Sequence, residues 1–285
     1  MLNVATAPDR NVDSLTSRIL GLYERLRAQV SLAPSPVVDA LFADLVSTCV
    51  RADEVDVAAV LSDPRISAVR SHLVGLCAEG ESLLENAWAR RVLTATDART
   101  EAAAFPYVDN YEQLTRLELH ALAGAGHRLE STRGVCFVGG GPLPLSAMLL
   151  CRTLAARVTV VDRDAEAVAL SRRLVDRLGP AERIEIVRSD AASASDMTHA
   201  AAGCDVVVVA ALVGMTRAQK RAALGAIGAS IGPTTYVVIR SAEGLRSLLY
   251  PTVDLRDVYD AGLVPEIVLH PYGKVVNSVI VARRR

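Results

Sequence analysis

Apolar residues recur at helical spacing over the first part of the chain, and β-branched runs are few before residue 130. Asp63 precedes Pro64, and this pair predicts a helix start, because the carboxylate can cap the helix and proline suits its first position. Residues 1–130 are therefore predicted to form an all-helical domain. The helices are expected over about residues 15–33, 37–50, 66–95 and 111–129.

The pattern changes after Gly134, where short apolar runs alternate with helical segments. Strands separated by helices predict a parallel sheet with right-handed crossovers and helices on both faces. We therefore expect an α/β domain over residues 131–285, with a last strand that pairs antiparallel at an edge. The expected strands are about 135–138, 158–161, 184–187, 205–210, 235–239 and 275–282, and the expected helices about 144–155, 164–178, 217–229 and 241–249.

The stretch from Gly134 to Asp162 reads GVCFVGGGPLPLSAMLLCRTLAARVTVVD. A short apolar run meets three glycines, and a helix-length apolar segment then leads to a second run that ends on Asp162. This pattern is typical of a βαβ unit with a glycine turn at the carboxyl end of its first strand, where nucleotide-like ligands bind. Glycine has no Cβ, so the backbone of such a turn can approach a ligand closely.

Three interpretations of the glycine turn compete: a dinucleotide site, a site for the sulfonium nucleoside S-adenosylmethionine (SAM), and a purely structural turn. The dinucleotide fingerprint GxGxxG requires glycine where this chain has Pro144. Pro142 also lacks the backbone N–H that a pyrophosphate near the helix start would need. The sequence therefore favours SAM over the other two interpretations.

Two carboxylates follow the next two predicted strands. Asp162 ends the second strand at a spacing that suits bonding to ribose hydroxyls. Asp164 is the better cap for the following helix, which leaves the Asp162 side chain free for the ligand. Asp190 ends the third strand, where its side chain can read an adenine edge. The alternative interpretation is that each is a solvated loop residue or a helix cap.

Composition limits the classes of partner. The 285 residues are 51% apolar and 22% charged, as in a soluble globular protein, and 31 basic against 32 acidic residues give a net charge of −1. Without a basic field, nucleic acid is not an expected partner. The most apolar segment, 204–215, is too short to cross a bilayer, and the first ten residues lack a secretory pattern, so we expect a cytoplasmic protein with no membrane partner. The five cysteines and five histidines lack ligand spacing, so no protein-bound metal is expected.

Three further segments carry candidate chemistry. Glu81 and Glu85 are one helical turn apart and share a face, although a solvated acidic face would look the same. Residues 105–111, FPYVDNY, break the helical pattern and are expected to form a loop over the ligand crevice. Arg240 follows the fifth strand and can clamp a carboxylate bidentately, unless it is a surface residue at a helix start.

Taken together, these stretches resemble the nicotianamine synthase family, including bacterial members that make opine-type metallophores. The resemblance covers about residues 75–285 and implies a Rossmann-like class I SAM-dependent transferase fold, with an N-terminal helical domain that contributes acceptor-site residues. It rests on six motifs in the family's order: AEGESLLE, FPYVDNYEQLTRLE, FVGGGPLPLSAMLL, VVDRDAEAV, IRSAEGLRSLLYP and VVNSVIVARR.

The resemblance implies transfer of the 3-amino-3-carboxypropyl group of SAM, the co-substrate, to an amine, with release of 5′-methylthioadenosine (MTA). It places Glu81 against the attacking amine and Tyr107 near the reacting centre. The chemistry agrees, because a protonated amine needs a carboxylate of raised pKa to hold it and take its proton. The implied SAM contacts are Gly139, Gly140, Gly141, Pro142, Leu143, Asp162, Arg163, Asp190, Ala191, Ala210 and Leu212. The implied substrate contacts are Glu79, Asn110, Tyr111, Arg240 and Tyr250.

The product expected from the resemblance is a nicotianamine-like metallophore or its precursor. Plant members tend to have RSAHG where this chain has RSAEG with Glu243, so the acceptor and the number of transfers stay open. Histidine and glutamate are candidate acceptors, and the α-amine of SAM could instead close on Cγ to give azetidine-2-carboxylate. A SAM-dependent methyltransferase and a SAM-binding regulator are the alternative functions. A homodimer is left open.

Overall fold

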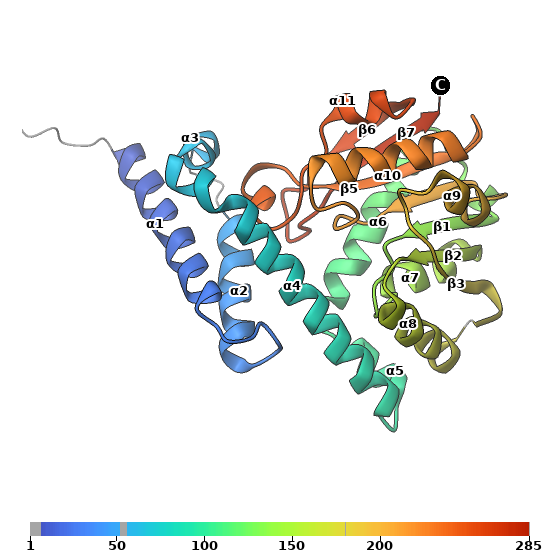
Figure 1. The fold of residues 1–285 in the computed structure, drawn as a ribbon, viewed down its shortest axis with the longest axis horizontal. Helices are drawn as coiled ribbons and strands as arrows, with labels where there is room; N and C mark the ends of the chain where they lie inside the picture. The colour runs from blue at the N-terminus through green and yellow to red at the C-terminus, as the bar shows by residue number, and fades with distance from the viewer. Residues whose placement is uncertain (1–6, 52–55, 180, 285) are drawn as a thin grey trace, which may run out of the picture.

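The computed structural model describes residues 7–51, 56–179 and 181–284. A group of helices lies at one end of the molecule, an α/β layer structure lies at the other, and the long helix α4 (Pro64–Thr94) runs from the first to the second (Figure 1). Residues 1–6, part of the segment without a secretory pattern, lie outside the described residues. Among the described helices, none combines the length and the apolar character that crossing a bilayer requires.

The N-terminal helices pack around a core of leucine and isoleucine side chains that includes Ile19, Leu45 and Leu73. The predicted start of α4 is confirmed, because the Asp63 side chain accepts a hydrogen bond from the Arg65 N–H and Pro64 occupies the first turn. The first helix ends earlier than predicted, at Arg27. The other helices before the sheet are α1 (Ala7–Arg27), α2 (Pro36–Val50), α3 (Val57–Ser62), α5 (Ala98–Ala103) and α6 (Val108–Gly124).

Seven strands form one sheet in the order β3-β2-β1-β4-β5-β7-β6. The first five strands in this order are parallel to one another, and β7 is antiparallel to both β5 and β6. The prediction that the last strand lies at an edge is therefore wrong, because β6 covers it. The strands are β1 (Gly134–Val138), β2 (Arg157–Asp162), β3 (Ile184–Arg188), β4 (Val206–Val209), β5 (Tyr236–Ser241), β6 (Leu263–Leu269) and β7 (Ser278–Arg284).

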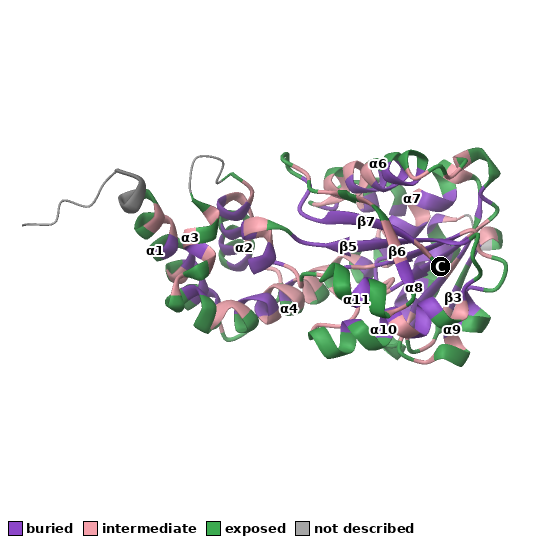
Figure 2. Ribbon diagram, turned by 90° about the horizontal axis from the view of Figure 1, so that it is seen from above, coloured by how far each residue is buried: buried purple, intermediate pink, exposed green. Residues whose placement is uncertain are grey.

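Helices cover both faces of the sheet, as expected for the Rossmann-like transferase fold, which is confirmed. Figure 2 shows α6 and α7 on one side of the buried strands and α9, α10 and α11 on the other. Side chains alternate along β1, so Phe137 packs into the first core and Val138 into the second. The helices after β1 are α7 (Leu145–Leu154), α8 (Ala165–Leu178), α9 (Ala194–Ala200), α10 (Arg217–Ser230) and α11 (Leu255–Asp260).

Two predicted segments differ from the structure near the ligand crevice. β5 continues to Ser241 and is followed by a short 3₁₀ helix, η3 (Gly244–Leu248), instead of the helix expected over 241–249. The segment 105–111 is not a loop over the crevice, because α6 begins at Val108 and its first turn includes Tyr111. Helix α6 then packs against α7 and β7, while α4 packs against α8, so the helices before residue 130 contact the sheet layers directly.

Candidate active site

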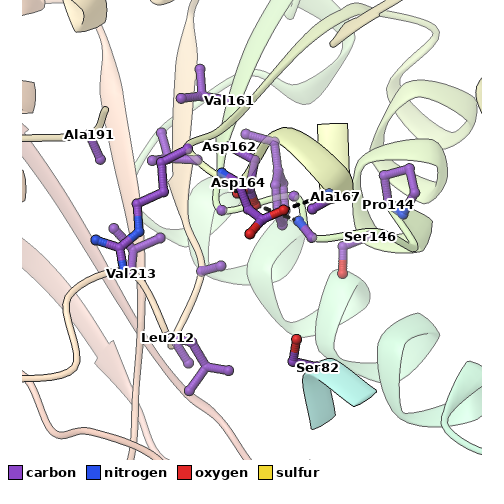
Figure 3. A pocket seen from close by; sticks show the side chains of 18 of the residues that line it. Ser82, Pro144, Ser146, Val161, Asp162, Asp164, Ala167, Ala191, Leu212 and Val213 are labelled. Carbon is purple, nitrogen blue, oxygen red and sulfur yellow. Dashed lines mark hydrogen bonds between the residues drawn. The ribbon is translucent and has the colours of Figure 1, made fainter. Parts of the chain in front are cut away.

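A cavity of about 580 Å³ lies at the carboxyl ends of the parallel strands, with α4 along its other side. It sits where the strand order reverses between β1 and β4, the usual ligand position in such sheets. Figure 3 shows Asp162 and Asp164 on one wall, Leu212 and Val213 on another, and Ser82 projecting from α4. Every SAM contact implied by the sequence lines this cavity, namely Gly139, Gly140, Gly141, Pro142, Leu143, Asp162, Arg163, Asp190, Ala191, Ala210 and Leu212.

The glycine turn exposes its backbone to the cavity because side chains do not fit there. Gly139 and Gly141 have φ values of 85° and 63°, in the left-handed region that glycine adopts without strain. A Cβ on Gly140 would lie 2.1 Å from Val160 Cγ1, so this position is closed on its inner side. The three glycines are therefore required by the geometry of the turn.

Asp162 organises the turn as well as facing the cavity. Its Oδ2 accepts a hydrogen bond of 2.8 Å from the Gly141 N–H, and its Oδ1 accepts one of 2.9 Å from the Asp164 N–H. Each carboxylate oxygen has a second lone pair, so both can also accept from ribose hydroxyls. Asp164 caps α8 through the Ala167 N–H, as predicted. Asp190 lines the cavity from the loop after β3, and its Oδ1 accepts from the Ala192 N–H.

Two glutamate–tyrosine pairs face the cavity from α4. The Tyr250 hydroxyl donates to Glu81 Oε2, and the Tyr111 hydroxyl donates to Glu85 Oε1, each over 2.7 Å. Glu81, Glu85 and both tyrosines line the cavity, so the acidic face predicted for α4 is not a solvated one. The tyrosines come from α6 and from the segment after η3, both far from α4 in sequence.

The protein environment favours the protonated form of both glutamates. Burial raises the pKa of Glu81, although the Tyr250 hydroxyl and the charge of Arg240 oppose the shift. Burial, followed by the charge of Glu81, raises the pKa of Glu85 to about 8. Burial also raises the pKa of Tyr111 and of Tyr250, so both stay hydroxyl donors at neutral pH. The cavity thus holds two carboxyl groups whose pKa values are raised, as is common for groups at functional sites.

Two residues implied by the sequence lie outside the lining of the cavity. Glu79 is exposed and does not line the cavity, because two residues before Glu81 is the opposite side of the helix. Tyr107 packs edge-on against Phe105, with ring centroids 5.8 Å apart. Burial raises the pKa of Tyr107, and the charge of Glu81 adds to the shift.

Arg240 does clamp a carboxylate, but the carboxylate belongs to the protein. Its Nε and Nη2 donate to the two oxygens of buried Glu118 over 2.6 and 3.3 Å, and Nη2 also reaches Ser146 Oγ. The interpretation of Arg240 as a free clamp for substrate is therefore corrected, although its side chain lines the cavity. Glu118 was missed, yet it lies on the buried stripe of α6 midway between Leu114 and Leu122, which is a detectable signal.

Asn110 also has a partner within the protein. Its Nδ2 donates over 3.0 Å to the Lys274 carbonyl and so connects the first turn of α6 to the segment before β7. Asn277, from the same segment, also lines the cavity and was not predicted. Asn110 is thus placed at the cavity wall with its amide already engaged.

Replacing Glu85 with glutamine should stabilise the unliganded protein. The unfolded carboxyl ionises near its ordinary pKa of 4.5 and the folded one near 8, so the folded state binds more protons between these values and loses stability as pH rises. Glutamine removes this dependence. We expect the unfolding midpoint of Glu85→Gln to exceed that of the parent protein by about 4 °C more at pH 8 than at pH 6. Thermal scans at both pH values test this, and an equal difference at the two would contradict it.

Comparison with known proteins adds three findings. The family model described as "Nicotianamine synthase protein" matches residues 7–285. The chain is similar to nicotianamine synthase 2 of Oryza sativa subsp. japonica, with 38% identity over 98% of this chain and 85% of that protein. It is 37% identical to nicotianamine synthase-like 5 protein of Hordeum vulgare, over 98% of each. Its fold is similar to that of MtNAS solved with MTA and tNA, with a TM-score of 0.79, 23% identity and coverage of 99% of each chain. An MtNAS variant with one Glu-to-Gln change, solved with S-adenosylmethionine, gives a TM-score of 0.76.

Proposed function

The chain belongs to the nicotianamine synthase family, and from this we propose that it transfers the 3-amino-3-carboxypropyl group of SAM to an amine and releases MTA. The observation that carries the proposal is the position of Glu81, which lines the same cavity as the glycine turn. SAM is the co-substrate, and the described residues contain no group of three or more His, Cys, Asp and Glu able to hold a metal ion.

The reaction requires an amine without its proton in line with the bond between Cγ and sulfur. Glu81 takes a proton from the acceptor ammonium, and the free nitrogen attacks Cγ. The Cγ–S bond breaks, its electron pair stays on sulfur, and the neutral thioether MTA leaves while the product keeps a secondary ammonium. The raised pKa of Glu81 makes it a suitable base for this step, since the surroundings already favour its protonated form.

Tyr250 and Tyr107 assist Glu81 in this proposal. The hydrogen bond from Tyr250 fixes the carboxylate, so that its remaining oxygen is directed to the amine. The charge of Glu81 also acts on Tyr107, to which the proposal gives the role of bonding the acceptor amine.

In this proposal, the two parts of the chain bind different substrates. Residues 1–130 supply Glu81 and Tyr107 to the acceptor side, and residues 131–285 supply the glycine turn and the carboxylates for SAM. The product in this proposal is a nicotianamine-like metallophore or its precursor, made in the cytoplasm from small-molecule substrates.

A product assay tests the proposed function. We expect the purified protein, incubated with SAM and a panel of amino acids, to release MTA, identified by the mass of the nucleoside. The mass of the second product names the acceptor, and a cyclic product formed without any added amino acid would identify azetidine-2-carboxylate. Detection of S-adenosylhomocysteine alone would overturn the proposal and favour a methyltransferase. Absence of any nucleoside product would favour a binding protein.

A further inference from the structure

Glu85 reaches from α4 to the glycine turn. A Cβ added to Gly141 would lie 2.7 Å from Glu85 Oε2, so the carboxyl group touches the turn where glycine leaves room for it. Gly141 is also held by Asp162, whose Oδ2 accepts from its N–H over 2.8 Å. Gly141 therefore has one carboxyl group from β2 on one side and one from α4 on the other.

One oxygen of Glu85 is open to a ligand. Oε1 accepts the hydrogen bond from Tyr111, whereas no described residue donates to Oε2, the oxygen beside the turn. The groups whose charges act on Glu85 are Glu81, Asp162 and Arg240, and the charge of Arg240 is balanced by Glu118. The Glu85 carboxyl group therefore has an open acceptor oxygen and lies in a cavity with more acidic than basic groups. Such a site suits a cation that donates hydrogen bonds.

The order of chemical groups along SAM indicates which cation Glu85 binds. If the ribose lies at Asp162, the substituent on C5′ must pass Gly141 toward α4, and in SAM this substituent is the sulfonium followed by the methionine chain. That chain ends in an α-carbon that carries an ammonium and a carboxylate; of the two cationic groups of SAM, the ammonium donates hydrogen bonds and the sulfonium donates none. Glu81, one turn earlier on α4, is then left for the amine of the acceptor.

We propose that Glu85, held by Tyr111, binds the α-ammonium group of the methionine part of SAM, so that donor and acceptor amines have separate carboxyl groups on one face of α4. This inference rests on the proposed function and assigns to Glu85 a binding role distinct from that of Glu81. The separate carboxyl groups also keep the α-amine of SAM protonated and away from the base, which disfavours cyclisation on its own Cγ.

Binding of three nucleosides tests the assignment without turnover. SAM carries both the sulfonium and the ammonium, S-adenosylhomocysteine carries only the ammonium, and MTA carries neither. We expect Glu85→Gln to weaken SAM and S-adenosylhomocysteine alike by about 10- to 100-fold, the usual effect of losing a charge-assisted hydrogen bond, and to leave MTA within about twofold. Titration calorimetry measures all three affinities.

Two further variants sharpen the comparison. Tyr111→Phe should weaken the two ammonium-bearing nucleosides in the same order by about 2- to 10-fold. Glu185→Gln is the matched control, with the same change at an exposed position of β3 outside the cavity, and should leave all three affinities within about twofold.

The pattern of losses decides the assignment. A loss confined to SAM would place Glu85 at the sulfonium, and an equal loss for all three nucleosides would make it a support of the turn; either result overturns the proposal, as does unchanged binding. These affinities can be measured even if the parent protein releases no MTA, so a failure of the proposed function is distinguishable from a failure of this inference.

Discussion

Glu81→Gln is expected to lower the rate of MTA release at least about 100-fold, the usual scale for the loss of a general base. The amide keeps the shape of the side chain and can still accept the hydrogen bond from Tyr250, but it does not take a proton from an ammonium group. The loss should therefore appear in kcat, while the affinity for SAM changes little. Single-turnover release of MTA, followed by chromatography, measures the effect directly.

The matched control for this experiment is Glu185→Gln, which makes the same change at an exposed position of β3 outside the cavity. It should keep MTA release within about twofold of the parent rate. A Glu81→Gln protein that folds normally and still releases MTA at the parent rate would show that Glu81 is only structural.

Glu118→Ala is expected to cost about 3–5 kcal/mol of stability and to lower the unfolding midpoint by roughly 10 °C. The ion pair with Arg240 is buried, with side chains 1% and 7% exposed, so removing the carboxylate leaves an uncompensated guanidinium between α6 and β5. The Ser146 hydroxyl and the ring of Phe137 remain as contacts for Arg240, but neither balances its charge. Urea unfolding gives the free energy.

A second pair of variants separates the buried charge from general damage to α6. Glu112→Ala on the same helix should change the stability by about 0.5 kcal/mol or less. The double variant Glu118→Leu with Arg240→Met removes both charges and should recover much of the loss. If Glu118→Ala costs less than about 1 kcal/mol, the ion pair does not have the role assigned to it.

The positions of residues that are close to one another in the sequence were predictable. The glycine turn, the strand before it and Asp162 after the next strand follow one another at fixed spacing, so their meeting at one crevice needs no long-range information. The shared face of Glu81 and Glu85 follows in the same way from helical periodicity. All of these residues line the cavity.

Contacts between distant segments were not predictable in the same way. The sequence did not indicate that Glu118 forms an ion pair with Arg240, because this pairing depends on how α6 packs on the sheet. β6 was missed because Pro265 and Glu266 interrupt its apolar pattern, as is tolerated at an edge strand. The position of Glu79 outside the cavity, by contrast, follows from its helical angle to Glu81 and could have been predicted.

Helix α4 also fixes the distance between Glu81 and Glu85. Four residues of an α-helix rise about 6 Å, and a helix of 31 residues packed at both ends does not stretch or compress easily. The spacing between the two carboxyl groups is therefore set by backbone geometry instead of by a flexible loop. Inserting one residue between them would turn Glu85 about 100° around the axis while Glu81 stays in place. Such a protein should still bind an acceptor amine at Glu81, but the Cγ of SAM would no longer be held in line with that amine.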